Sequence, residues 1–220
     1  MWSSGIDKGM LVCSIQELST FTADGYMEHA GWDVAAAGDV DGDGEEEILV
    51  GAPYRRSGDS TDEQGFPYSP GRVYLIEAPQ VEESDLESHA TAIIEGSVSW
   101  SFLGQCADGI GDINGDGFDD IMIGVPGHTS DDPTDPAEGR VDLFLGPITG
   151  ELSDEDADYS WEGDSPGDYL GYEIASGEDL DGDGVVDVAI GAYKSSVVAR
   201  DGGSVWILSG ADLEMIATLD

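Results

Sequence analysis

Short apolar runs separated by clusters of glycine and aspartate dominate the chain. Three of these runs are continuous, and they lie at 48–53, 121–126 and 188–193. Three further runs alternate in polarity or are rich in β-branched and aromatic residues, and they lie at 71–76, 139–144 and 203–208. Both patterns are typical of β-strands, and a continuous apolar run indicates a strand that is covered on both faces. Because no convincing amphipathic helix is found beside them, the sequence predicts an all-β fold.

The strands belong to a unit that occurs three times in the same order. In every copy a leading glycine lies eight residues before the first aspartate of a nine-residue acidic loop, and a trailing glycine lies twelve residues after it. The leading glycines are Gly31, Gly104 and Gly171, and the trailing glycines are Gly51, Gly124 and Gly191. With a weaker strand near 92–94 or 159–161, each unit contains four short strands, A to D, and the acidic loop joins A to B. Four-stranded antiparallel units that repeat every 65 to 75 residues or so predict a β-propeller.

The units divide the chain into one partial and three full blades. Residues 1–28 are expected to supply strands C and D of a preceding blade, at 9–12 and 19–22. The full blades are expected at 29–95, 96–162 and 163–220, and the last one closes with a strand at 213–219. A ring of three blades would leave open edges. We therefore expect an incomplete propeller, which more chain or self-association of copies would complete.

The acidic loops, at 39–47, 112–120 and 179–187, carry short oxygen donors at alternate positions. Because alternate side chains of a curled loop point inwards, these donors are expected to converge. Glycines at positions 4 and 6 allow the positive φ angles that the curl requires. Position 7 is chemically unrelated between the copies, which favours a backbone carbonyl ligand there. The predicted metal ligands are Asp39, Asp41, Asp43, Glu45 and Glu47, then Asp112, Asn114, Asp116, Phe118 and Asp120, and then Asp179, Asp181, Asp183, Val185 and Asp187.

A flexible cage of oxygen donors suits Ca²⁺ better than Mg²⁺, so we expect about three calcium ions, one in each A–B loop. An EF-hand shares the opening pattern but needs a glutamate at position 12, where this chain has Val50, Ile123 and Ile190. Metal-free acidic turns are the alternative, which is disfavoured because converging carboxylates repel one another without a cation. We expect a structural ion rather than a regulatory one, since extracellular modules bind Ca²⁺ at about 10⁻⁴–10⁻³ M.

Together these features resemble the FG-GAP repeat proteins, of which the integrin α-chain β-propellers are the best-known members. The aromatic-Gly element of that family is matched loosely at 102–104 and 169–171, and at 30–31 with the aromatic residue gone. Its Gly-Ala-Pro element is intact at 51–53, reads Gly-Val-Pro at 124–126 and is eroded at 191–193. The resemblance covers nearly the whole chain and implies a propeller of seven blades, of which this chain would form a part.

Acidic residues greatly outnumber basic ones: 48 Asp and Glu stand against 7 Lys and Arg, for a formal net charge of −41. Such a surface repels nucleic acids and anionic membranes, so neither is an expected partner. Three bound Ca²⁺ ions would change −41 only to −35, because each ion adds two charges. Adaptation to a salty environment is therefore an additional hypothesis.

Neither the cysteines nor the apolar runs indicate a redox or membrane protein. Cys13 and Cys106 lack the spacing of a metal or redox pair, and buried thiols are favoured over a disulfide. No apolar run is long enough to span a membrane, and the N-terminal residues do not form a signal peptide. We expect an extracellular or cell-surface module whose signal lies outside this chain.

The long B–C loops, at 53–70, 126–138 and 192–202, are expected on the face opposite the acidic loops. Most cationic residues lie in these loops or at the start of strand C, together with several aromatic residues. They are Arg55, Arg56, Arg72, Arg140, Lys194 and Arg200, with Tyr54, Phe66, Tyr68 and Tyr193. Long loops on one face of a repeat array commonly bind partners, so we expect a protein or polysaccharide ligand here. The alternative is that the arginines only pair with the surplus carboxylates.

No catalytic motif accompanies the repeats: the chain has no His-Glu-x-x-His, nucleophile elbow, phosphate-binding glycine loop or Cys–His pair. His29, His89 and His128 occupy unrelated positions and are expected at the surface. The chain also lacks Arg-Gly-Asp, so integrin-type adhesion does not follow from the resemblance. We predict a non-enzymatic, extracellular calcium-binding FG-GAP module with a structural or interaction role like that of adhesion proteins. The alternatives are an accessory propeller of a secreted hydrolase or a carbohydrate-active enzyme.

Overall fold

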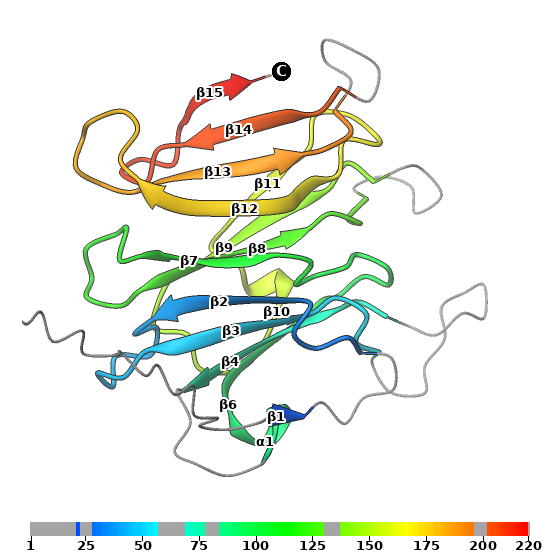
Figure 1. Cartoon of the computed structure of the whole chain (residues 1–220), viewed down its shortest axis with the longest axis vertical. Coiled ribbons are helices and arrows are strands. Elements are labelled where there is room, and N and C mark those ends of the chain that lie inside the picture. Colours follow the sequence, from blue (N-terminus) through cyan, green and yellow to red (C-terminus); the bar gives the residue numbers. More distant parts are fainter. Residues whose placement is uncertain are drawn as a thin grey trace, which may run out of the picture.

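The computed structural model describes residues 21–22, 28–56, 69–77, 84–129, 137–195 and 202–219. Three sheets, each with four antiparallel strands at its centre, follow one another along the long axis of the molecule and do not close into a ring (Figure 1). The all-β fold and the order of strands A to D are confirmed. In these described residues no helix has the length and apolar character needed to cross a bilayer.

Each sheet is one propeller blade, and the acidic loop joins its first two strands as predicted. The first blade contains β2 (Asp33–Gly38), β3 (Glu47–Ala52), β4 (Arg72–Glu77) and β6 (Ala90–Glu95). The second contains β7 (Ala107–Gly111), β8 (Asp120–Val125), β9 (Arg140–Phe144) and β11 (Tyr159–Glu162). The third contains β12 (Leu170–Glu178), β13 (Asp187–Ala192), β14 (Ser204–Leu208) and β15 (Met215–Leu219).

An additional strand leaves the second blade and joins the first. This strand, β10 (Gly150–Ser153), lies between β9 and β11 in the sequence but pairs in parallel with β6, so the first sheet has five strands. In the first blade, β5 (Ser84–Asp85) similarly pairs in parallel with β1 (Phe21–Thr22). A short helix follows each of these strands, α1 (Leu86–His89) after β5 and the 3₁₀ helix η1 (Asp154–Asp156) after β10. The expectation of four strands per blade was therefore incomplete.

The preceding half-blade expected in residues 1–28 lies mostly outside the described residues. Only β1, at the end of the segment expected to form strand D, is described as a strand. β1 pairs in parallel with β5, and β6 pairs in parallel with β10, so the two additional strands are attached in the same way.

Apolar cores fill the spaces between adjacent blades. The central strand β8 is buried at every position, as predicted for a strand covered on both faces. Ile121 and Ile123 contribute to the core shared with the first blade, whereas Met122 contributes to the core shared with the third. Cys106 joins the latter core as a buried free thiol, as predicted, and Cys13 lies outside the described residues.

The trailing glycines allow neighbouring blades to approach closely. A Cβ atom at Gly51 would lie 2.2 Å from the carbonyl oxygen of Gly104, and one at Gly124 would lie 2.1 Å from that of Gly171. The leading glycine of each following blade thus packs directly on the trailing glycine of the blade before it, which explains the fixed spacing in the sequence. At Gly191 of the third blade the nearest neighbouring atom would be 3.6 Å away.

Candidate metal loops and the opposite face

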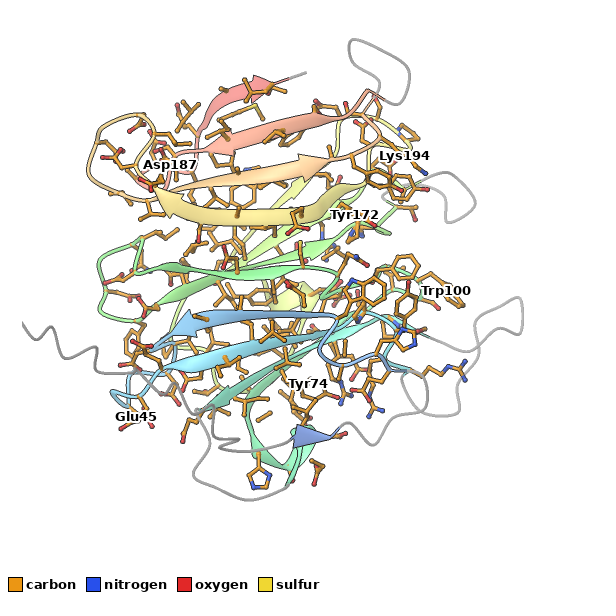
Figure 2. All side chains as sticks on the ribbon, viewed as in Figure 1. Glu45, Tyr74, Trp100, Tyr172, Asp187 and Lys194 are labelled. Atoms are coloured by element: carbon orange, nitrogen blue, oxygen red, sulfur yellow. The ribbon has the colours of Figure 1, made fainter. Side chains whose placement is uncertain are left out.

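The three acidic loops lie at the same end of the blades, where Figure 2 labels Glu45 and Asp187. All six loop glycines have φ angles between 75° and 96°, which confirms the predicted left-handed curl. They are Gly42, Gly44, Gly115, Gly117, Gly182 and Gly184. This curl allows side chains at alternate positions of each loop to turn towards its centre.

One hydrogen-bond pattern is repeated in the three loops. In the first loop, Asp39 accepts the N–H groups of both loop glycines at 2.8 and 3.1 Å. Asp41 accepts the N–H of Asp43 at 3.0 Å, and Asp43 accepts the N–H of Glu45 at 2.9 Å. The equivalent bonds recur in the other two loops. The sequence folds in this way because short polar side chains bond readily to the backbone two to five residues ahead.

The ninth residue closes each loop from the first position of strand B. Glu47, Asp120 and Asp187 are buried, and each accepts the N–H of the second loop residue at 3.0, 3.0 and 2.6 Å, respectively. The two aspartates use their other oxygen to accept the N–H of Gly146 and Gly210, at 2.8 and 3.1 Å. Burial raises the pKa of Asp120 and raises the pKa of Glu47 to about 7, and nearby loop aspartates add to both shifts. A bound cation would stabilise these desolvated carboxylates.

Predicted ligands converge most clearly in the first and third loops. Single carboxylate oxygens lie within 4.8 Å of one another in two groups, Asp39 with Asp41 and Asp43, and Asp179 with Asp181 and Asp187. In the second loop, Asn114 stands where the others have a carboxylate, and its amide donates to Asp116 at 3.0 Å. Carboxylate and amide oxygens are the donors that Ca²⁺ prefers. The residues present therefore fit the expected ion.

Neighbouring loops are also linked to each other. Asp119 accepts the N–H of Asp39 at 2.8 Å and donates its own N–H to the carbonyl of Asp39 at 3.0 Å. The adjacent Phe118 ring packs against Gly42 of the first loop. Because a phenylalanine side chain carries no ligand atom, Phe118 could bind a metal only through its backbone carbonyl. Asp119 carries no signal in the repeat, because Glu46 and Val186 occupy the same position in the other two loops.

Arginines at the opposite end of the blades form ion pairs within the chain. Arg55 lies 3.5 Å from Glu28 and 3.1 Å from Glu87, and Arg72 lies 2.5 Å from Glu95. Arg55 and Arg72 therefore pair with carboxylates of the chain itself. Arg200, Phe66 and Tyr68, which were expected on the same face, lie outside the described residues.

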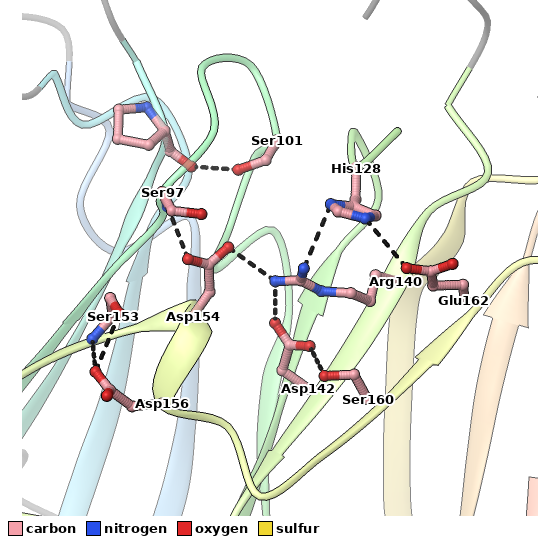
Figure 3. A network of polar contacts seen from close by, with 11 residues as sticks. Ser97, Ser101, His128, Arg140, Asp142, Ser153, Asp154, Asp156, Ser160 and Glu162 are labelled. Atoms are coloured by element: carbon pink, nitrogen blue, oxygen red, sulfur yellow. Dashed lines mark hydrogen bonds and ion pairs between the residues drawn. The ribbon is translucent and has the colours of Figure 1, made fainter. Parts of the chain in front are cut away.

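A buried polar network surrounds Arg140 (Figure 3). Its guanidinium donates to Asp142 at 2.7 Å and to Asp154 at 2.8 Å, and neither acid has exposed side-chain surface. His128 lies 3.5 Å from Arg140 and 3.4 Å from Glu162. Only 8% of His128 is exposed, so its expected surface position was wrong, and burial together with the Arg140 charge lowers its pKa. Because Asp154 follows β10, the network also ties that strand to the second blade.

Aromatic rings gather at this end of the blades, where Figure 2 labels Trp100 and Tyr172. One group, with neighbouring ring centroids 4.9 to 6.3 Å apart, contains His29, Trp32, Tyr54, Trp100 and Phe102. A second group, with centroids 4.4 to 5.6 Å apart, contains Tyr169, Tyr172 and Tyr193. The amine of Lys194 lies 4.8 and 5.1 Å from two of these tyrosine rings. Trp32, Trp100, Tyr172 and Tyr193 are 41% to 49% exposed.

The imidazole of His29 takes the place of the aromatic residue that the first repeat lacks. His29, Phe102 and Tyr169 each lie two residues before a leading glycine, and their φ angles are 57°, 57° and 55°. A left-handed conformation is uncommon for such bulky residues, so its recurrence marks a shared turn. The sequence signal was the spacing to the glycine, which the substitution by histidine obscured.

Comparisons with known proteins agree with this geometry. A model of the FG-GAP repeat matches residues 30–76, 108–144 and 170–208. Integrin alpha-PS2 of Drosophila melanogaster is 32% identical over 179 residues, which are 78% of this chain and 12% of that protein. Integrin alpha-IIb of Mus musculus is 32% identical over 178 residues, which are 79% of this chain and 15% of that protein. The chain thus spans 12% to 15% of the length of these relatives. Each matched segment falls on the first three strands of one blade, and together the segments cover more than half of the chain, so the chain belongs to the FG-GAP repeat family.

Proposed function

We propose that the chain is an extracellular, calcium-stabilised interaction module with an adhesion-like role and no enzymatic activity of its own. The separation of two ends of the blades carries this proposal: oxygen donors converge at one end, and exposed aromatic rings gather at the other (Figure 2). Membership of the FG-GAP family and similarity to integrin alpha chains support an adhesion-type role.

In this proposal each A–B loop holds one Ca²⁺ ion, about three in all, through positions 1, 3, 5, 7 and 9. The repeated hydrogen bonds hold the carboxylates in place before the ion arrives, so little reorganisation is needed on binding. The ion offsets repulsion between acids that the loop brings close together. Calorimetric titration with Ca²⁺ tests this point, and an absence of binding at millimolar Ca²⁺ would contradict it.

The opposite end is proposed to bind a protein or polysaccharide ligand through the aromatic groups. Tryptophan and tyrosine provide large, amphipathic contact surfaces, and they are enriched among the residues that dominate binding energy at interfaces. The ion pairs of Arg72 and Arg140 are largely buried, so these arginines do not form the contact surface. The aromatic rings are therefore the better candidates for direct contact.

Binding to immobilised polysaccharides and extracellular-matrix proteins, measured with the purified chain in Ca²⁺, tests the ligand face. We expect the double variant Trp32→Ala, Trp100→Ala to weaken any specific binding by roughly tenfold or more, as truncation of interface tryptophans commonly does. Leu180→Ala is the control, because Leu180 is 57% exposed but lies in an acidic loop at the other end. Equal binding by the two variants would contradict a role for the aromatic face.

A further inference from the structure

The first blade differs from the other two where its acidic loop meets the sheet. Glu47 at the start of β3 lies directly opposite Glu77 at the end of β4. In the second and third blades, the residues at the position of Glu77 are Leu145 and Ser209. Like charges that face each other across an antiparallel pair destabilise it. The first blade therefore contains a charge conflict that its neighbours avoid.

Glu47 also has one carboxylate oxygen without a partner. Its Oε2 accepts the N–H of Val40 at 3.0 Å, whereas Oε1 is buried and accepts no hydrogen bond. The equivalent aspartates of the other loops use both oxygens. None of the ion pairs found among the described residues involves Glu47 or Glu77. The described part of the chain thus supplies neither a hydrogen-bond donor for this oxygen nor a side-chain cation for this pair of acids.

Asp41 completes a group of three carboxylates at this point. One oxygen from each of Asp41, Glu47 and Glu77 lies within 4.8 Å of the other two. Oxygen ligands of a single Ca²⁺ ion lie at most about 5 Å apart, because each is 2.3–2.6 Å from the metal. This group shares only Asp41 with the group formed by Asp39, Asp41 and Asp43. In the third loop the ninth residue, Asp187, groups with the first and third residues of the loop, whereas in the first blade Glu47 groups with Asp41 and Glu77. Glu77 therefore adds a second focus beside the loop site, and this focus has no equivalent in the third loop.

We propose that the first blade binds a second divalent cation, held by Asp41, Glu47 and Glu77, that has no counterpart at Leu145 or Ser209 in the other blades. Asp41 and Glu47 also belong to the proposed loop site, so they bridge this cation to the ion of the loop, and that bridging role rests on the calcium loops proposed above. The cation separates the opposed glutamates and provides the partner that Oε1 of Glu47 lacks.

The local charge supports this count of ions. Residues 39–47 contain six carboxylates, and Glu77 adds a seventh, so one Ca²⁺ would leave −7 + 2 = −5. The loops at 112–120 and 179–187 contain four carboxylates each, so one Ca²⁺ leaves −4 + 2 = −2. A second ion brings the first blade to −7 + 4 = −3, which is close to the value of its neighbours.

Equilibrium dialysis against Ca²⁺, followed by atomic emission, counts the ions bound per chain. We expect Glu77→Gln to bind one ion fewer than the wild-type chain. Glu77 is exposed, so the substitution should preserve the fold, and circular dichroism verifies this. Glu46→Gln is the matched control: it removes one charge from an exposed side chain of the same loop that belongs to neither group, and it should bind as many ions as the wild type.

Equal counts for Glu77→Gln and Glu46→Gln would overturn the inference, because they would mean that no ion depends on Glu77. If both variants still bind ions in equal number, only the second site fails and the loop sites stand. If the wild-type chain binds no calcium, the second site and the proposed calcium loops fail together.

Discussion

Replacing Gly124 with alanine should force the second and third blades apart. The new Cβ would lie 2.1 Å from the carbonyl oxygen of Gly171 and 2.6 Å from Sγ of Cys106, whereas ordinary contacts begin near 3.4 Å. The missing 1.3 Å (3.4 minus 2.1) must come from the backbone, because the closer atom belongs to the main chain at the start of β12. Overpacking of a tight interior costs about 1–3 kcal/mol, and a clash with fixed backbone belongs at the upper end of that range.

Gly191→Ala is the matched control, because the same position of the third blade has no atom closer than 3.6 Å and neither glycine has a positive φ. Urea unfolding at saturating Ca²⁺ should show a loss of about 2–3 kcal/mol for Gly124→Ala. Gly191→Ala should be neutral or up to about 1 kcal/mol more stable, because alanine restricts the unfolded chain. For a chain of this size, about 2–4 °C per kcal/mol converts the loss into a fall in melting temperature of about 4–12 °C. Equal stability of the two variants would refute the contact between blades as the reason for the trailing glycines.

Three further outcomes are expected. Chelation of Ca²⁺ should lower the melting temperature measured by calorimetry. Free Ca²⁺ at 100 times its dissociation constant stabilises a one-site protein by about 2.7 kcal/mol, and chelation removes this contribution. An unchanged melting temperature would contradict stabilisation by calcium. Arg140→Met should cost about 3–5 kcal/mol in urea unfolding at neutral pH, because it leaves Asp142 and Asp154 buried without their cation. Burial raises the pKa of Asp142, so this deficit should shrink as the pH falls and Asp142 becomes protonated, and an equal deficit at pH 7 and pH 4.5 would refute the reasoning. The pKa of His128 is lowered in the folded chain, so its contribution to stability is complete above the unfolded pKa of about 6.5 and is lost as the pH falls through the folded value. His128→Gln should reduce the pH dependence of the free energy of unfolding in this range. An unchanged pH dependence would contradict the lowered pKa of the buried His128.

The blades and loops could be predicted because their positions depend on local chemistry that repeats. Glycine at positions 4 and 6 and short acids at alternate positions determine the loop conformation within nine residues. The distance between leading and trailing glycines follows from the contact that Gly51 and Gly124 make with the next blade. Each feature appears three times in the sequence, so its pattern stands out from chance.

Features that depend on distant partners escaped prediction. The segment that forms β10 is short and polar, and its pairing is determined by the free edge of β6 rather than by its own pattern. His128 is buried because Arg140, twelve residues further on, and Glu162 from β11 enclose it. Glu77 is a polar residue at the end of a strand, and the sequence does not indicate that it lies opposite Glu47 in the sheet.

The parallel strand β10 gives the growing chain an order of events during synthesis. The outer edge of the first blade stays open until residue 153 has emerged, 58 residues after β6 ends at residue 95 (153 minus 95). At about 5–20 residues per second, this interval lasts roughly 3–12 s, and an open strand edge is prone to aggregation during that time. The same arrangement bears on evolution. Because β10 lies between β9 and β11 in the sequence, an exchange of the first blade keeps the edge of β6 covered only if the second blade up to residue 153 is carried with it.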